Sequence, residues 1–404
     1  MTGKTDATAY TLLVTEDRGG GSVIVPGATA STFAPQPGSS IAAIGRVRQD
    51  FGASYGGLLL TDRENDASSG GGYNRVFGPD FLWRMSQHDQ VSGQILISDT
   101  RTPDRPDLDP SWDGRRLTSR AFYVEWRHTG YHWFYSALHG DYGEEFRADD
   151  GFVPQVGYRH EKGVVGYTIY NTGIFSQLTA GPFCNYSTRS DGALIQRQCG
   201  LFANPNGILN LTGEIDLVPG ERNRIGEAVV DSNFTVYYNL SIDPGRVFSR
   251  VTLNGFAGDY PDVANGRPGR GAEVGLTATV KPTDHLILDF NGDRQWLDVD
   301  SDGRSGRLFT AEIARLKATY NFTSRTFLRL IGQYFTASQD PTLYDFPVPE
   351  TDRSLTASAL FAYTPNWQTV FYLGYGDSRA LNSAGDLAPA GRQLFLKVSY
   401  AFQR

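Results

Sequence analysis

A regular alternation of apolar and polar residues is the feature that most constrains what this chain can form. Near the C-terminal end, the alternate apolar positions are Leu394, Leu396, Val398, Tyr400 and Phe402. Successive side chains of an extended strand point to opposite faces, so this period of two predicts a strand with one apolar face. The pattern recurs in residues 314–320 and 367–375. We therefore predict an all-β chain.

The connections between the predicted strands alternate between short and long. Short turns are expected at residues 243–245 and 364–366, and longer loops at residues 99–114, 258–271 and 376–390. Short periplasmic turns that alternate with longer external loops are typical of outer-membrane barrels. The sequence predicts a closed antiparallel up-and-down transmembrane β-barrel of about 20 strands, within limits of about 18 to 22. All 404 residues are assigned to this one barrel domain.

Closure of the barrel follows from the membrane as a solvent. Lipid cannot satisfy exposed backbone groups, so every strand needs a neighbour on both sides. We therefore expect the first strand, near Ala7, to pair with the last, which ends at Phe402. Two candidate strands, at residues 152–160 and 164–171, break the up-and-down order if both cross the membrane. One of them is expected to be an incomplete strand or an inserted hairpin.

Composition excludes several other classes. Charged residues make up 20% of the chain, the net charge is -7, and neither sign is clustered, so nucleic acid is not an expected partner. No stretch approaches the roughly 18 uninterrupted apolar residues of a transmembrane helix, and a barrel with a polar lumen needs none. No apolar run follows Met1 to Lys4. We expect the secretory signal to lie upstream of this sequence.

Charged residues within predicted strands indicate which face lines the lumen, because charge on the lipid face is costly. Glu125 and Arg127, for example, alternate with Phe122, Val124 and Trp126. The predicted lumen-facing charged residues are Arg46, Arg48, Glu125, Arg127, Arg315, Lys317 and Arg329. They either line a water-filled path or form networks that hold an internal plug.

Two cysteines, Cys184 and Cys199, flank a polar segment that contains Ser190, Asp191 and Gly192. In a hairpin they would face each other, and the envelope compartment permits a disulfide. The alternative is a pair of buried free thiols.

Asp298, Asp300 and Asp302, followed by Gly303, are expected to lie in a loop and reproduce the first half of a calcium-binding loop. The second half fails, because Phe309 stands where a bidentate glutamate is needed. Weak calcium binding is one interpretation. A solvated hairpin tip, which also needs acidic residues and glycine, is the other.

Some outer-membrane barrels are hydrolases, and their chemistry needs a base beside a nucleophile. The candidates here are His139 with Asp141, or Ser136 near His139, but no nucleophile motif accompanies them. We predict that the chain is not an enzyme and has no catalytic residue. A barrel-rim hydrolase is kept as a lesser alternative.

The chain resembles the bacterial outer-membrane barrel family catalogued as domain of unknown function fifty-nine-sixteen. The resemblance is carried by residues 2–4, 15–22, 61–64, 73–81 and 151–155. It implies that an upstream carbohydrate-binding module, similar to family nine, precedes the barrel in the whole protein. The resemblance implies a location in the outer membrane and no established activity.

These observations predict an outer-membrane pore or conduit for a solute, related to saccharides if the upstream module is a guide. The alternative is a passive membrane anchor for an N-terminal binding domain, and a third interpretation is a soluble all-β protein. The expected partners are the lipid bilayer, the solute and the barrel-assembly machinery. That machinery would bind the C-terminal strand, residues 394–402.

Overall fold

The computed structural model describes residues 1–301, 303–382 and 384–401. The chain forms two compact units. The first comprises Met1–Thr168, Gly181–Cys199 and Arg222–Val229, and the second comprises Ile169–Ala180, Gly200–Glu221 and Val230–Arg404. The division between the units crosses strands β11 to β15, so each unit is described by itself.

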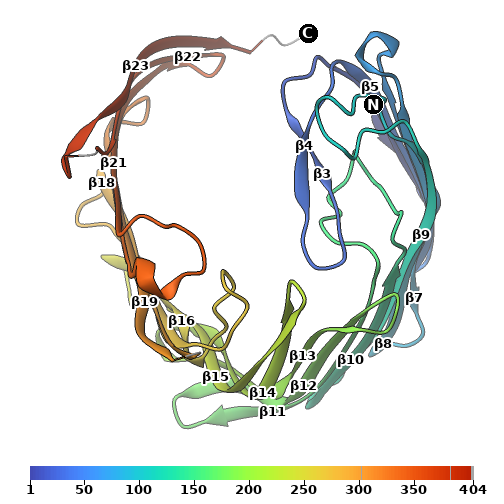
Figure 1. The fold of residues 1–404 in the computed structure, drawn as a ribbon, viewed down its shortest axis with the longest axis horizontal. Coiled ribbons are helices and arrows are strands. Elements are labelled where there is room, and N and C mark those ends of the chain that lie inside the picture. The colour runs from blue at the N-terminus through green and yellow to red at the C-terminus, as the bar shows by residue number, and fades with distance from the viewer. Residues whose placement is uncertain (302, 383, 402–404) are drawn as a thin grey trace. The chain divides into compact units, whose positions relative to one another are not determined.

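Strands dominate both units (Figure 1). The first ten are β1 (Thr2–Lys4), β2 (Thr8–Asp17), β3 (Ser22–Val25), β4 (Thr32–Pro35), β5 (Ser40–Phe51), β6 (Ser54–Asn65), β7 (Tyr73–Arg84), β8 (Asp89–Arg101), β9 (Arg116–Thr129) and β10 (Trp133–Tyr142). The next five are β11 (Tyr158–Thr172), β12 (Phe175–Arg189), β13 (Leu194–Gly207), β14 (Leu211–Ile225) and β15 (Ala228–Ile242). The last eight are β16 (Phe248–Asp259), β17 (Arg270–Val280), β18 (Leu286–Ser301), β19 (Arg304–Thr323), β20 (Thr326–Gln339), β21 (Thr351–Asn366), β22 (Thr369–Leu381) and β23 (Leu387–Tyr400). Three short 3-10 helices, η1 (Ala67–Ser69), η2 (Ile208–Asn210) and η3 (Pro341–Leu343), lie in connections.

The strands follow one another in an antiparallel up-and-down order. A 21-stranded sheet contains all of the described strands except β3 and β4, which pair only with each other. Twenty strands of the described chain, β2 and β5 to β23, have ten or more residues each. This confirms the predicted strand number. The pairing of the first strand with the last stays a prediction.

Connection lengths alternate as predicted in part of the chain. The expected long loop at residues 376–390 is wrong, because β22 runs to Leu381 and β23 begins at Leu387, and the connections at residues 190–193 and 226–227 are also short. Short turns such as residues 52–53 and 130–132 alternate with longer connections such as residues 102–115 and 143–157. Gly52 adopts a φ of 63° in the β5–β6 turn, a conformation that glycine adopts without a steric penalty. The candidate strands at residues 152–160 and 164–171 do not both cross the membrane. One continuous strand, β11, contains the second candidate and the end of the first.

In the first unit, the register separates an apolar face from a polar one. Val47, Leu58 and Phe77 lie on one face and are exposed, as expected for lipid-facing residues. Arg46, Arg48, Glu125 and Arg127 lie on the opposite face of their strands, as predicted.

The second unit shows the same separation. Leu316, Leu330 and Leu373 are exposed on the apolar face, and Leu396 and Val398 extend this face across β23. Phe402, which was assigned to the same face, lies outside the described residues. The predicted charged residues Arg315, Lys317 and Arg329 occupy the polar face.

The face assignment can be tested with a charge inserted on each side of β20. Leu330→Arg places a guanidinium against lipid and is expected to lower the free energy of unfolding by about 2 to 4 kcal/mol. Gln333→Arg, on the polar face of the same strand, is the control and should have a much smaller effect. Urea unfolding in lipid bilayers measures both, and equal losses would contradict the assigned faces.

Candidate functional site: loops folded onto the polar faces

In the first unit, two connections cover the polar face of the sheet. Residues 18–39, which contain the β3–β4 hairpin, and residues 143–157, which join β10 to β11, are here called the inner layer. Figure 1 shows β3 and β4 on the concave side of the wall that contains β5, β7, β8 and β9. A backbone bridge between Gly27 and Gln155 links the two parts, and the Gln155 side-chain amide donates to the Ala28 carbonyl at 2.6 Å.

An apolar cluster holds residues 143–157 against the sheet. Phe146 is fully buried and packs with Val76 of β7, Ala121 of β9 and Val156. Burial of an aromatic side chain of this kind stabilises a contact by about 1.5 to 3 kcal/mol. The segment is therefore a packed part of the unit.

Asn74 of β7 binds the backbone of residues 143–157 through its side chain. Its side-chain amide donates to the Arg147 carbonyl at 3.1 Å and to Thr100 Oγ1 at 2.7 Å. Its carbonyl oxygen accepts a hydrogen bond from the Asp149 N–H at 2.9 Å. The side chain is almost completely buried, so this network is costly to break.

Arg63 of β6 connects residues 143–157 of the inner layer to the sheet by charge. Its guanidinium lies 2.9 Å from the Asp17 carboxylate at the end of β2 and 3.3 Å from that of Asp150. The Arg63 and Asp150 side chains are both largely buried, so removal of one partner would leave an uncompensated charge.

A cavity of about 220 Å³ lies within the inner layer. Its charged lining residues are Asp17, Arg63, Arg147 and Asp149, and Ser22 and Gln36 add polar groups. Burial raises the pKa of the Asp149 carboxyl to about 6, and burial also lowers the pKa of the Arg147 guanidinium. The cavity therefore holds charged groups of both signs in a poorly hydrated place.

Loops also fold onto the polar face of the second unit. Arg267 donates to the Asp262 carboxylate at 2.8 Å and to the Leu343 carbonyl, and both charged side chains are almost fully buried. Leu343 packs with Leu297, Val299 and Leu308 of β18 and β19. The predicted loop at residues 258–271 is thus tied to the connection that contains η3.

Most of the predicted lumen-facing charges are paired on their own sheet face. Arg46 contacts Asp80, Arg48 contacts Asp50 at 2.7 Å, and Glu125 accepts from Arg127 at 2.8 Å. In the second unit Lys317 lies 2.7 Å from Asp289. Arg315 and Arg329 lie on the same face as Lys317.

The acidic segment that resembles a calcium loop is not a loop. Asp298 and Asp300 belong to β18, Val299 between them is buried, and Asp298 forms an ion pair with Arg307. The prediction of a loop is wrong because the antiparallel pairing of β18 with β19 continues through Asp298 and Asp300. Asp302 lies outside the described residues. No cluster of three or more metal-binding side chains occurs in the described chain, and calcium binding stays a prediction.

The hydrolase candidates do not form a catalytic arrangement. Ser136 and His139 point to opposite faces of β10, because they are an odd number of residues apart. His139 contacts Glu161 at 3.2 Å, and Asp141 contacts Arg159 at 3.5 Å. The side chains of Asp141 and His139 are thus both engaged with β11.

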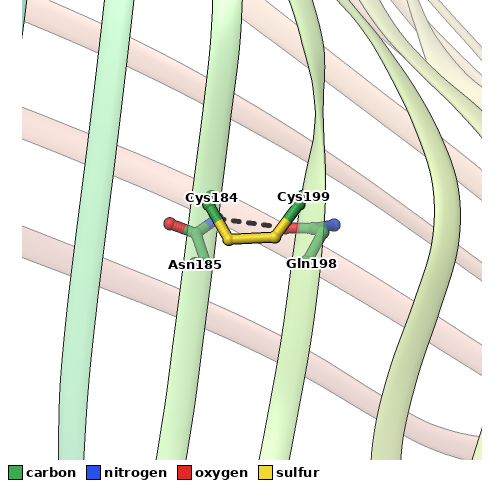
Figure 2. The surroundings of a disulfide bond; sticks show 4 residues. All are labelled: Cys184, Asn185, Gln198 and Cys199. Atoms are coloured by element: carbon green, nitrogen blue, oxygen red, sulfur yellow. Dashed lines mark hydrogen bonds between the residues drawn. A yellow bond between two sulfur atoms is a disulfide. The ribbon is translucent and has the colours of Figure 1, made fainter.

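Cys184 of β12 and Cys199 of β13 are joined by a disulfide, as Figure 2 shows. Beside it, the Asn185 amide donates to Gln198 Oε1 at 3.2 Å across the same pair of strands. Both bonds tie neighbouring strands of the first unit together.

The residues of the inner layer were not identified from the sequence as a site. Arg63, Asn74, Arg147 and Asp149 are far apart in the chain and follow no common period. The only indication of these residues in the sequence is the expected family resemblance. Its segments at residues 15–22, 61–64, 73–81 and 151–155 contain Asp17, Arg63, Asn74 and Gln155, which meet here.

Solved structures resemble this fold throughout its length. The siderophore receptor PirA from Pseudomonas aeruginosa matches with a TM-score of 0.56 and 10% sequence identity, over 99% of this chain and 75% of that chain. PirA from Acinetobacter baumannii matches with a TM-score of 0.54 and 10% identity, over 98% and 74% of the two chains. No family model and no curated protein matches. The resemblance to the family of unknown function therefore stays a prediction.

The fold is that of an outer-membrane β-barrel. Its exposed apolar face is the kind of surface that a membrane barrel presents to lipid. No helix of the described residues is long and apolar enough to cross a membrane.

The raised pKa of Asp149 predicts a specific pH dependence. The pKa of this carboxyl is about 6 in the folded protein, against an ordinary 3.8. Its ionisation therefore lowers the free energy of unfolding of the protein as the pH rises from about 4 to 6. Asp149→Asn should therefore raise the free energy of unfolding at pH 7 by roughly 1 to 3 kcal/mol and have little effect at pH 4. Urea unfolding at both pH values tests this. A destabilised variant at pH 7 would mean that the carboxylate is favourably paired.

The disulfide predicts that the native protein has no thiol to alkylate. Mass spectrometry after alkylation without reductant should show no added group, and reduction beforehand should add two. Two labelled cysteines in the unreduced protein would refute the bond.

Proposed function

We propose that this protein is a conduit for a small solute across the outer membrane, with a lumen narrowed by its own folded-in loops. The observation that carries the proposal is the concentration of charged side chains on the polar faces, including Arg315, Lys317 and Arg329. A hydrated interior is the least costly environment for such groups in a membrane.

The inner layer supports a gated conduit. Residues 143–157 reach the polar face through the Phe146 cluster and the Asn74 hydrogen bonds, so they restrict the path on the side of the first unit. PirA is described as a siderophore receptor, and uptake of a small solute by this chain is proposed partly by analogy with it. A saccharide remains our proposed solute class, supported by the family resemblance.

The main alternative is a passive anchor for an upstream binding domain. In that case the folded-in loops would only seal the lumen, and no solute would pass. A non-enzymatic role is common to both proposals. Interaction with the barrel-assembly machinery through β23 is proposed for both as well.

Planar bilayers distinguish the conduit from the anchor. The purified chain should conduct ions, and Arg315→Glu with Lys317→Glu should move the reversal potential towards that of the cation, because the polar face loses positive charge. Arg115→Glu, in the exposed connection before β9, is the control and should leave selectivity unchanged.

Replacement of residues 143–157 by a short glycine and serine linker should increase the conductance if the inner layer narrows the path. Absence of conductance in the wild type, in the charge variant and in this loop variant would overturn the conduit and leave the anchor.

A further inference from the structure

The cavity of the inner layer contains two charged side chains, Arg147 and Asp149, that attract each other electrostatically but form no side-chain hydrogen bond among the described residues. Arg63 and Asp17, which also line the cavity, are paired with each other at 2.9 Å. In contrast, Nη1 of Arg147 is buried without a hydrogen-bond partner among the described residues. The Asp149 carboxylate likewise accepts no hydrogen bond from that part of the chain.

The backbone that carries these two side chains is held in place, and no hydrogen bond joins the two charged groups. The Arg147 N–H donates to Ser98 Oγ at 3.3 Å, its carbonyl accepts from Asn74, and the Asp149 N–H donates to Asn74. Asn74 and Ser98 are buried residues of β7 and β8, so the backbone between the two charges is anchored to the wall. The site is therefore organised before a ligand arrives, which lowers the entropic cost of binding.

A buried charge without a hydrogen-bond partner carries a desolvation penalty. A ligand group that pairs with this charge offsets the penalty and so contributes to the binding free energy. The Arg147 guanidinium can donate two parallel hydrogen bonds, and a carboxylate has the geometry to accept both. Asp149 needs a cationic donor. A ligand with only one of these groups would leave the other side chain unpaired.

We propose that this cavity binds a small zwitterion of the α-amino-acid class, with its carboxylate on Arg147 and its ammonium group on Asp149. Gln36 and Ser22 line the same cavity and offer hydrogen-bonding groups to a polar ligand side chain. A volume of about 220 Å³ is below the range of pockets for drug-sized ligands and excludes an oligosaccharide. The inference concerns a ligand of the inner layer and goes beyond the solute proposed for the lumen.

Isothermal titration of the full chain in detergent, at pH 7, tests the proposal with matched probes. L-alanine and the larger L-glutamine carry both charges. Lactate has the size of alanine but lacks the ammonium group, and L-alaninamide lacks the carboxylate. At least one of the two amino acids should bind about tenfold more tightly than lactate and alaninamide, which corresponds to about 1.4 kcal/mol for one lost charge contact.

Variants locate the binding. Arg147→Gln and Asp149→Asn should each weaken amino-acid binding about tenfold or more, whereas Arg246→Gln and Asp107→Asn, at exposed positions, should not change it. The shift in electrophoretic mobility on heating reports whether each variant is folded. If Arg147→Gln does not fold, Arg147→Lys replaces it, because it keeps the charge but loses the bidentate geometry.

Failure to bind either amino acid, equal affinity for all four probes, or unchanged binding by the folded cavity variants would overturn the proposal. Bilayer conductance is measured separately. Amino-acid binding without conductance would retain this inference and remove the conduit, and conductance without binding would do the reverse.

Discussion

Lipid offers no hydrogen-bonding partner to a peptide group, and the organisation of this chain depends on that constraint. Each membrane-spanning strand must pair with its neighbours, which favours the antiparallel up-and-down order of the sheet. Because side chains alternate across a strand, the same constraint separates Arg329 from Leu330, adjacent residues on opposite faces of β20. Charges such as Lys317 and Arg329 lie on the face opposite the apolar one. Arg294 and Glu312 are exceptions, which pair with each other on the face of Leu316.

Charges gathered on one face then need partners of their own, and the chain supplies them in two ways. Some pair within the sheet, as Lys317 does with Asp289. Others are met by loops that fold onto the face, as when Arg63 of β6 reaches Asp150 of the inner layer. In the second unit the buried Arg267 pairs with Asp262 of its own connection and donates to the Leu343 carbonyl of another. The loops are thus held by electrostatic and apolar contacts together.

The strand pattern, the face of each predicted charge and the cysteine pair could be predicted because they depend on residues close in sequence. Alternation is a local property, and Cys184 and Cys199 lie 15 residues apart in one hairpin. The inner layer could not be predicted in this way, because Arg63 and Asp150 are 87 positions apart and Asn74 and Asp149 are 75 apart. The loop predicted at Asp298 was wrong for a local reason. The apolar residues change from one face of β18 to the other between Phe290 and Val299, so local periodicity did not reveal that the strand continues there.

The residues of the inner layer indicate whether it only seals the lumen or also binds a ligand. A seal needs packed apolar contacts, such as those of Phe146, and buried charges weaken it unless they are paired. No hydrogen bond joins Arg147 to Asp149 at the cavity in the described residues, and apolar side chains of similar volume would close the same space with less desolvation. These charged groups are explained if the inner layer binds a charged ligand, and they are not required of an inert anchor.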